Sequence, residues 1–422
     1  MINTEHFKNK KVVVVGLARS GLACANLLYD RGAQVSVTDN SDNDSTRVSA
    51  LKLKSKDIKL ELGRHTREFI KGNELMVISP GLSDDSQPVI WARSLGIPVV
   101  SEIEVAWSLC PAKVIAVTGS CGKTTVATLI GRMLEAAGKK AWVCGNIGNP
   151  FSAQIEKIRE RDFISLEVSS FQLEKIDKFR PQIAVILNFS ANHLDRYKSL
   201  GDYLEAKKRI FMNQKEGDFL VLNALQAEFK EWPKETKAQI KYFSGNPENN
   251  PNLAALLVIA SILGISQDVV HKVVGEFKGI QHRLEQVAEI NNVVFINDSK
   301  ATTADSTLWA LKNLQRPIVL IVGGRDKGVD YSMILGLARE KVREVILLGE
   351  AKEKIRSAFK GSLSMEEADT LPEAVQRGYA LARPGDCVLL SPMCSSFDMF
   401  ADYEERGECF KKAVYALEGR KS

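Results

Sequence analysis

Residues 118–125, with the sequence Thr-Gly-Ser-Cys-Gly-Lys-Thr-Thr, decide the fold of this chain. They follow an apolar run and precede a segment with helical apolar spacing at residues 124–137. A glycine-rich turn between a buried strand and a helix directs backbone N–H groups toward a phosphate. We therefore expect Lys123 to reach the outer phosphates of a nucleotide and Thr124 to hold Mg²⁺. Because Val117 stands where the strict Walker A pattern has glycine, the match is to a T-G-x-x-G-K-T-T variant.

Short apolar and β-branched runs recur along the whole chain. Continuous apolar runs, rather than alternation, indicate strands that are buried on both faces and hence parallel sheets. Helical patterns such as residues 21–31 lie between the runs, and this alternation predicts an α/β fold. The predicted strands are residues 11–15, 75–79, 113–118, 163–167, 183–188, 219–223, 293–297, 317–322, 344–348 and 387–391.

The chain has 422 residues, which suggests two or three domains at roughly 150 residues each. The order of the motifs favours three. We predict a Rossmann-like domain at residues 1–101, a central P-loop ATPase-like domain at residues 102–279 and a second Rossmann-like domain at residues 280–422. We also predict a surface loop at Asn40–Arg47, where Asn and Asp are frequent, and a core helix at Leu253–Ile265.

The composition excludes several classes of protein. The 57 basic and 52 acidic residues leave a net charge of +5, too small and dispersed to indicate nucleic-acid binding. No run approaches the ~20 apolar residues of a membrane span. The seven cysteines show no C-x-x-C pair, which is typical of reduced thiols in the cytosol. We predict a cytoplasmic, monomeric protein that neither binds nucleic acid nor inserts into a membrane.

A second strand-to-helix turn, Val-Gly-Leu-Ala-Arg-Ser-Gly at residues 15–21, lies near the N-terminus. Asp39 ends the next strand about 20 residues later, the spacing of a ribose contact. The glycine pattern is G-x-x-x-x-G rather than G-x-G-x-x-G, so it favours a nucleotide diphosphate over NAD. A turn with a purely structural role is the alternative.

Polar groups follow other predicted strands. Glu167 ends a strand beside the P-loop, where a carboxylate can bind Mg²⁺ or orient water, although a solvated rim residue is the alternative. His193 follows another strand; composition alone indicates a polar surface histidine, because Mg²⁺ prefers oxygen ligands. Three polar turns, residues 298–303, 323–328 and 391–398, follow strands of a third sheet and should share one rim, where their lysines suggest an anionic ligand.

Together these motifs resemble the Mur ligase family of ATP-dependent amide ligases of peptidoglycan synthesis. The resemblance covers essentially the whole chain and follows the order of the family's signatures. Within the family, the chain is similar to the branch that adds D-glutamate, while the D-N-P-[AR] motif of the diamino-acid-adding branch is absent. The family signatures are residues 118–125, 166–174, 188–195, 282–283 and 298–300, and those of the branch are residues 79–81, 391–400 and 404–407.

The resemblance implies an ATP- and Mg²⁺-dependent ligase that joins UDP-N-acetylmuramoyl-L-alanine to D-glutamate through an acyl phosphate. The implied catalytic residues are Lys123, Glu167, His193 and Lys207. The implied metal ligands are Thr124, Glu167, His193 and a carbamylated Lys207. The implied ATP-binding residues are Gly119, Ser120, Cys121, Gly122, Lys123, Thr124, Thr125, Asn252, Arg283, Asp298 and Lys300. The implied residues for the UDP substrate are Leu17, Ala18, Arg19, Ser20, Asp39, Asn40, Ser79, Asn146 and Ser169. The implied residues for D-glutamate are Thr302, Lys327, Ser396, Phe397 and Tyr403.

Lys207 has two interpretations. By composition it belongs to a basic run, residues 207–209, that indicates a solvated helix face. The resemblance implies instead a carbamylated side chain. Helical spacing places Lys207 on the same face as Tyr203 and Lys208 elsewhere. Cys121 also departs from the family pattern, which more often has Asn there, but backbone donors do most of the phosphate binding in such a loop.

Three other functions stay open at this point. A folylpolyglutamate-type ligase would lack the 100 or so residues that precede the P-loop here. An NAD-dependent oxidoreductase would leave the P-loop unexplained. The third is a nucleotide-binding protein without catalysis. Phosphate release that depends on both UDP-N-acetylmuramoyl-L-alanine and D-glutamate separates all of them from the ligase.

Overall fold

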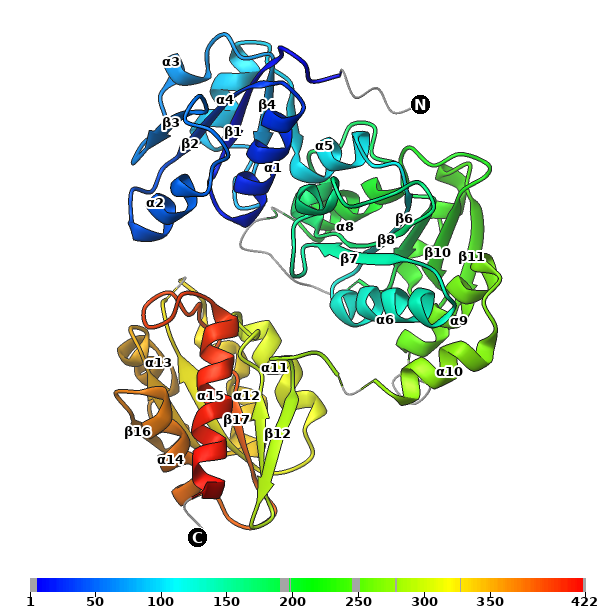
Figure 1. The fold of residues 1–422 in the computed structure, drawn as a ribbon. Helices are drawn as coiled ribbons and strands as arrows, with labels where there is room; N and C mark the ends of the chain where they lie inside the picture. The colour runs from blue at the N-terminus through cyan, green and yellow to red at the C-terminus, as the bar shows by residue number, and fades with distance from the viewer. Residues whose placement is uncertain are drawn as a thin grey trace. The chain divides into compact units, whose positions relative to one another are not determined.

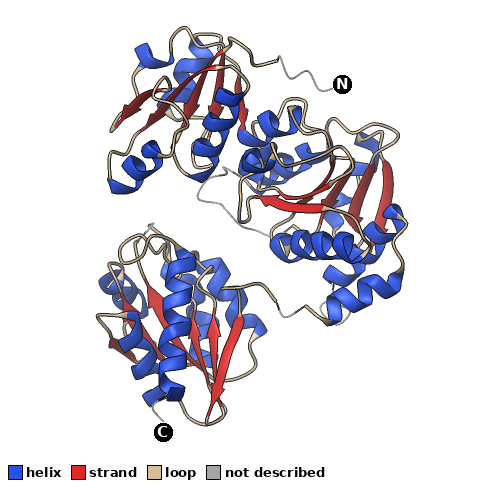
Figure 2. Ribbon diagram, in the orientation of Figure 1, coloured by secondary structure: helices blue, strands red, loops and turns tan. Residues whose placement is uncertain are grey.

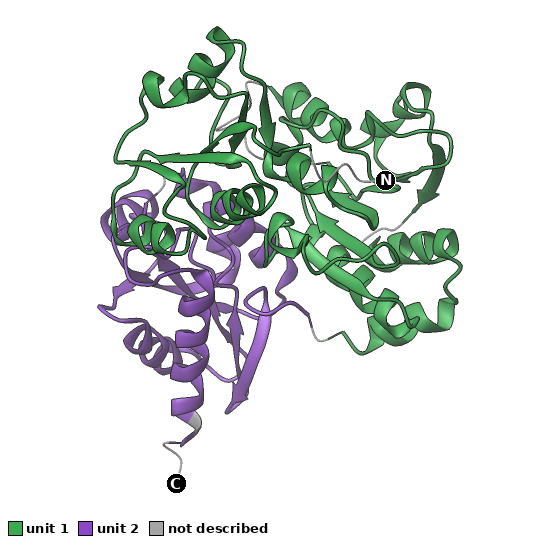
Figure 3. Cartoon of the chain, turned by 45° about the horizontal axis from the view of Figure 1, so that its top comes forward, with its two compact units in different colours: residues 1–277 green, residues 278–422 purple. Residues whose placement is uncertain are grey.

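The structure is a computed structural model, and it describes residues 6–189, 197, 199–244, 251–277, 279–326 and 328–419. Helices flank three β-sheets (Figures 1 and 2), so the predicted α/β class is confirmed. The chain forms two compact units, residues 1–277 and 278–422 (Figure 3). In the described residues, no helix combines the length and the apolar character that crossing a membrane requires.

The first sheet has five parallel strands in the order β3-β2-β1-β4-β5. Its central strand is buried from Val12 to Val15, as its unbroken apolar run predicts. The strands are β1 (Lys11–Val15), β2 (Gln34–Asp39), β3 (Lys59–Leu62), β4 (Leu75–Ile78) and β5 (Val99–Ser101). The helices are α1 (Arg19–Asp30), α2 (Asp44–Leu51), α3 (Arg67–Ile70) and α4 (Gln87–Ser94).

The helix α2 overlaps the stretch Asn40–Arg47, which the sequence predicted as a loop; that prediction is wrong for its last four residues. Asn43 caps the helix: its Oδ1 accepts from the Thr46 backbone N–H at 3.0 Å, and Thr46 Oγ1 accepts from the Asn43 N–H at 3.0 Å. Asn and Asp favour helix N-caps as well as loops, because their side chains satisfy free N–H groups. The polar cluster therefore marked the start of a helix.

The second sheet has six parallel strands in the order β11-β10-β9-β6-β8-β7. The predicted core helix is α9, which the structure begins two residues earlier, at Pro251. The strands are β6 (Lys113–Thr118), β7 (Ala141–Gly145), β8 (Phe163–Glu167), β9 (Ile183–Ile186), β10 (Phe219–Asn223) and β11 (Gln239–Phe243). The helices are α5 (Glu102–Ser108), α6 (Lys123–Ala136), α7 (Ser170–Leu173), α8 (Leu200–Lys208), α9 (Pro251–Leu263) and α10 (Gln267–Gly275), and the short 3₁₀ turns include η1 (Ser152–Gln154).

Helix α5 ties the first sheet to the second. The Glu104 carboxylate accepts three backbone N–H groups, those of residues 177–179, each at 2.9 Å. Glu102 Oε1 accepts the Ser152 N–H at 2.6 Å. One apolar core runs from Val12 and Val77, through Ile103 and residues 105–106, into β6 and β8. Because these two sheets share a core, they form one compact unit, and the predicted boundary after residue 101 stays a prediction.

The third sheet belongs to residues 278–422 and has the order β12-β13-β17-β14-β15-β16. The strands are β12 (Glu285–Ile290), β13 (Val293–Asn297), β14 (Ile318–Gly323), β15 (Val342–Leu348), β16 (Met365–Glu367) and β17 (Cys387–Leu390). The helices are α11 (Ala304–Asn313), α12 (Leu335–Lys341), α13 (Lys352–Phe359), α14 (Leu371–Leu381) and α15 (Tyr403–Glu418).

The prediction of parallel sheets is wrong for one pair, because β12 runs antiparallel to β13. Asn291 and Asn292 connect these strands with φ values of 50° and 61°. Consecutive left-handed residues form the tight turn that suits a β-hairpin, and Asn adopts them more readily than most residues. The edge strand β12 has the sequence Glu-Gln-Val-Ala-Glu-Ile, without a continuous apolar run, so a search for such runs does not find it.

Candidate active site

The P-loop turn joins β6 to α6, and glycine is required at two of its positions. Gly119 has a φ of 151° and Gly122, the N-cap of α6, a φ of 81°. A Cβ atom on Gly122 would lie 3.1 Å from Oδ1 of Asn252. The structure therefore brings the predicted nucleotide residue Asn252 against the loop. The first turn of α6 presents backbone N–H groups, as an anion site at a helix N-terminus requires.

Asn188 braces this turn, and the sequence did not assign it a role. Its Oδ1 accepts the Cys121 N–H at 2.8 Å and its Nδ2 donates to the Cys121 carbonyl at 3.1 Å. Its own carbonyl accepts the Ser120 N–H at 3.1 Å. These contacts hold backbone atoms of Cys121, so none of them requires a particular side chain at that position. The only sign in the sequence that Asn188 has a role was its place as the first residue of the family signature at residues 188–195, which follows β9.

Two lysine ammonium groups converge on one carbonyl of the P-loop. Lys123 Nζ donates to the Gly119 carbonyl at 2.8 Å and to the Ser120 carbonyl at 3.0 Å. Lys207 Nζ donates to the same Gly119 carbonyl at 3.0 Å, although it lies 88 residues away in sequence. Two like charges at one acceptor repel each other, so this arrangement favours an anion nearby or a neutral amine.

Lys207 is buried, with an exposed fraction of 1%, so the interpretation as a solvated helix face is wrong. Its Nζ lies 4.4 Å from the centre of the Tyr203 ring, which confirms the predicted shared face. Burial lowers the pKa of Lys207 well below its ordinary value, and the Lys123 ammonium lowers it further. Lys208 points away, to ion pairs with Glu205 and Glu235. Of the two lysines in this run, Lys207 is therefore the one whose ammonium form is disfavoured.

Glu167 and Thr124 fit a divalent cation beside the P-loop. Glu167, 2% exposed at the end of β8, accepts at Oε1 from Asn146 Nδ2 at 2.9 Å. Its Oε2 is buried and has no hydrogen-bond partner among the described residues. A buried carboxylate oxygen without a donor is a ready ligand for a hard cation such as Mg²⁺. Thr124 is also buried. In the described residues no three His, Cys, Asp or Glu side chains gather, and His193 lies outside those residues.

The turn between β1 and α1 is held by Asp39. One carboxylate oxygen of Asp39 accepts the Leu17 N–H at 2.6 Å and the other accepts the Ser41 N–H at 2.8 Å. Ser79, at the end of β4, stands against the turn, since a Cβ atom on Gly16 would lie 2.5 Å from its Oγ. The structure thus brings the predicted residues Leu17, Asp39 and Ser79 to one edge of the first sheet. Ala18, Arg19, Ser20 and Asn40 follow directly in the same two turns.

Replacing Asp39 with alanine is expected to weaken binding of the UDP substrate that the resemblance implies by about tenfold or more. The carboxylate loses two hydrogen bonds that shape the turn, and hydrogen bonds to charged groups contribute about 1.5–3 kcal/mol each. Isothermal calorimetry with the UDP substrate measures the effect. Asp42→Ala, at an exposed acid paired with Arg47, is the matched control and should leave the affinity unchanged. Equal affinities for the two variants would place the pocket elsewhere.

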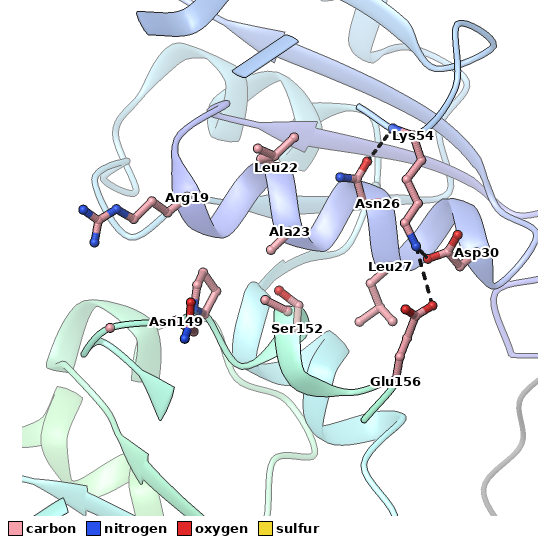
Figure 4. Close-up of a pocket in the computed structure, with 13 residues that line it drawn as sticks. Arg19, Leu22, Ala23, Asn26, Leu27, Asp30, Lys54, Asn149, Ser152 and Glu156 are labelled. Atoms are coloured by element: carbon pink, nitrogen blue, oxygen red, sulfur yellow. Dashed lines mark hydrogen bonds and ion pairs between the residues drawn. The ribbon is translucent and has the colours of Figure 1, made fainter. Parts of the chain in front are cut away.

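A cavity of about 450 Å³ lies between α1 and the segment that follows β7 (Figure 4). Arg19 stands at one end of the cavity, and Lys54 lies between Asp30 and Glu156 at the other. Among the residues predicted for the UDP substrate, Arg19 lines it. Asn149 and Ser152 form the opposite wall of the cavity. They belong to the segment after β7 that also contains Asn146, the residue that donates to Glu167.

In the second unit, the three predicted polar turns meet. Asp298 is 4% exposed, and its two carboxylate oxygens accept from Ser391 Oγ at 2.9 Å and from the Leu284 N–H at 3.2 Å. Burial raises the pKa of Asp298 to about 7. The Arg325 N–H donates to the Ser395 carbonyl at 2.9 Å, which joins the turn after β14 to the turn after β17.

The predicted D-glutamate residues lie on these turns, with different exposure. Ser396 is buried, whereas Phe397 is exposed. The Thr302 N–H donates to the Lys300 carbonyl at 3.0 Å, and Lys300 Nζ lies 5.6 Å from the centre of the Tyr403 ring. Lys327 lies outside the described residues. The predicted nucleotide residues Arg283, Asp298 and Lys300 also belong to this second unit.

Gly407 packs directly on the imidazole of His282. From the sequence, this glycine was named only as part of the signature at residues 404–407 and was given no role of its own. A Cβ atom there would lie 2.2 Å from His282 Nδ1, so no larger residue fits. The Gly407 carbonyl accepts from Asn297 Nδ2 at 3.2 Å, and the same Nδ2 lies 2.9 Å from His282 Nδ1. The first turn of α15 therefore fixes His282, the neighbour of Arg283.

Three family profiles match this chain in order. The N-terminal profile, described as "Mur ligase MurD-like, N-terminal domain", covers residues 10–101. The second, "Mur ligase middle domain", covers residues 117–297, and the third, "Mur ligase, glutamate ligase domain", covers residues 282–394. The chain belongs to the Mur ligase family. The P-loop and the Glu167 strand end of this Mur ligase lie in the middle-domain match, and the turns after β13, β14 and β17 begin in the third.

Curated relatives of this Mur ligase match over nearly the full length. A protein of Caldanaerobacter subterraneus subsp. tengcongensis is 39% identical over 97% of this chain and 99% of its own, and one of Geotalea daltonii is 39% identical over 98% of both chains. Both are named UDP-N-acetylmuramoylalanine–D-glutamate ligase. Among solved structures, the UDP-N-acetylmuramate-alanine ligase of Thermotoga maritima covers 97% of this chain and 100% of its own, at a TM-score of 0.61 and 17% identity, and so supports the fold.

Proposed function

We propose that this Mur ligase adds D-glutamate to UDP-N-acetylmuramoyl-L-alanine at the expense of ATP. The relatives that carry this name match both ends of the chain at 39% identity, and this observation supports the assignment most strongly. Neither the folylpolyglutamate ligase nor the oxidoreductase is supported by these relatives. We place the enzyme in the cytoplasm as a monomer, with a Rossmann-like first domain, a P-loop ATPase-like middle domain and a Rossmann-like third domain.

The reaction makes an amide from a carboxylate, which is a poor electrophile in water. The alanyl carboxylate attacks the γ-phosphoryl group of ATP, which gives an acyl phosphate and ADP. The amine of D-glutamate then attacks the acyl carbon, and phosphate leaves from the tetrahedral intermediate. The protein contributes mainly positioning and charge, since phosphoryl transfer needs little covalent help.

The roles of the P-loop residues follow from their positions. Lys123 begins α6 and brings an ammonium group to the turn that would hold the phosphates. Its charge stabilises the transferring phosphoryl group, and the N–H groups of the first turn of α6 orient it. Asn252 stands against Gly122 at the side of the turn, where an adenine contact is proposed.

Thr124, Glu167, His193 and a carbamylated Lys207 are the residues that we assign to Mg²⁺. When bound there, Mg²⁺ would neutralise negative charge on the phosphates. A carbamate on Lys207 would replace a repelled ammonium by an oxygen ligand. Asn146 donates to Oε1 of Glu167 and so leaves Oε2 for the cation.

Phosphate release tests the function. The purified chain should release phosphate from ATP only when UDP-N-acetylmuramoyl-L-alanine and D-glutamate are both present, and the product should gain the mass of one glutamyl residue. Phosphate release from ATP without D-glutamate would contradict the assignment. Activity with NAD or with folate substrates would also contradict it.

Replacing Lys327 with alanine is expected to raise the KM for D-glutamate by about 10–100-fold, since a hydrogen bond to a charged group contributes about 1.5–3 kcal/mol. In the sequence, Lys327 belongs to the glycine-rich stretch 323–328, which was predicted to follow a strand of the third sheet. The KM values for ATP and for the UDP substrate should change little. Lys360→Ala, at an exposed lysine of the same unit, is the control. An equal rise for all three substrates would indicate a structural role instead.

A further inference from the structure

Arg406 is a nearly fully buried side chain, with an exposed fraction of 2%. It lies in the first turn of α15. Nε donates to Ser299 Oγ and Nη2 to the Ser299 carbonyl, both at 2.9 Å. Nη1 and Nη2 both donate to the Cys394 carbonyl at 3.2 Å. Every one of these acceptors is a neutral oxygen.

The charge of Arg406 is therefore not neutralised by direct contact. A buried guanidinium is usually paired with a carboxylate, because removing a charge from water is costly. In the part of the chain that the structure describes, Arg406 forms hydrogen bonds but no ion pair. Burial lowers the pKa of Arg406 to about 10, while the Cys394 thiol and the Asp398 carboxylate act in the opposite direction. The group keeps its charge at neutral pH. Asp398 Oδ2 accepts the Glu350 N–H at 3.0 Å, and its Oδ1 is buried without a hydrogen-bond partner among the described residues, so this carboxylate acts on the guanidinium charge without forming an ion pair with it.

The guanidinium joins all three polar turns of the third sheet. Ser299 belongs to the turn after β13 and Cys394 to the turn after β17. The third turn also closes on it, because a Cβ atom on Gly324 would lie 3.1 Å from Arg406 Nη1. These turns carry Thr302 and Ser396, two residues proposed for D-glutamate. The unpaired cation thus lies behind the rim proposed for an anionic amino acid.

We propose that Arg406 is a positioning residue that determines specificity: its buried, unpaired charge gives the rim a positive potential that selects an amino acid with a second carboxylate. The inference rests on the proposed function and deepens it. In a region of low dielectric a fixed charge acts over several ångströms without touching the ligand. The neutral oxygens that hold Arg406 fix its position without cancelling that potential.

The test compares D-glutamate with D-glutamine, which has nearly the same shape but one carboxylate fewer. For Arg406→Gln we expect the ratio of the two kcat/KM values to fall by about tenfold, the effect of one charge at ~10 Å and an effective dielectric of ~20. The KM values for ATP and for the UDP substrate should stay within about twofold. Arg406→Lys, which keeps the charge but loses the fork of donors, should retain most of the preference for D-glutamate.

Arg377→Gln is the matched control, because Arg377 belongs to the same unit, is partly exposed and is paired with Glu373 at 2.8 Å. Thermal unfolding reports whether each variant is folded. An unchanged ratio in folded Arg406→Gln would overturn the inference, and so would an equal rise of all three KM values. If Arg406→Gln does not fold, a tenfold loss of preference in Arg406→Lys would overturn it. A wild-type enzyme without D-glutamate-dependent phosphate release would instead contradict the proposed function.

Discussion

Replacing Lys123 with alanine is expected to lower the turnover of the ligase by about 10²–10³-fold, the usual loss when a group that stabilises transition-state charge is removed. Lys123 directs its ammonium group to the carbonyls of the P-loop turn, where the phosphates are proposed to bind. It is the first residue of α6 and is not part of the apolar core, so the fold should persist. Phosphate release at saturating substrates measures turnover, and circular dichroism checks the fold.

Lys113→Ala is the control for this variant. Lys113 begins β6, the strand that ends at the P-loop, but it is exposed at the opposite end of that strand. Its replacement should leave turnover within about twofold. Near-normal turnover in Lys123→Ala would contradict the assignment of the P-loop.

The second large effect is expected for Lys207. Lys207→Ala should be nearly inactive, and a small carboxylate such as acetate should restore part of the activity by supplying the missing oxygen ligand. The buried position and the nearby Lys123 ammonium disfavour the ammonium form, and a neutral amine is the form that reacts with CO₂. Lys208→Ala is the matched control, since Lys208 lies at the surface in ion pairs, and it should have a mild effect.

A direct measurement separates the carbamate from a plain amine. Protein that is equilibrated with ¹³C-bicarbonate should show a carbamate carbonyl resonance in the wild type and in Lys208→Ala but not in Lys207→Ala. Full activity of Lys207→Ala, or the absence of this resonance from active wild-type enzyme, would contradict the carbamate.

The strand–turn–helix units could be predicted because each leaves a local signal. The apolar run of β6 and the glycines after it mark the P-loop, and the bounds predicted for β8 and β10 agree with the structure. The edge strand β12 could not be found by this route, because polar residues interrupt its apolar ones and only one of its six residues is buried. Parallel pairing follows from burial on both faces, and β12 lacks that burial.

Contacts between segments that are distant in the chain could not be predicted from the sequence. Asn188 holds the backbone of Cys121 across 67 residues, and no local pattern predicts that pairing. The burial of Lys207 depends on the same long-range packing, because its own surroundings in sequence are basic and polar. Arg406 is another example of burial that depends on long-range packing. Its acidic neighbours in the sequence are typical of a surface helix, yet the turns after β13, β14 and β17 pack against its guanidinium.

The shared core behind α5 bears on how this protein can be divided for experiments. A cut after residue 101, where a family profile ends, would pass through one continuous apolar core and expose buried side chains on both fragments. A cut near residue 278 avoids this, since the core clusters of the second unit consist only of its own residues. The end of the first family profile at residue 101 is therefore not a boundary between compact units, whereas the third profile begins close to one. Fragments for ligand-binding work should begin or end near residue 278.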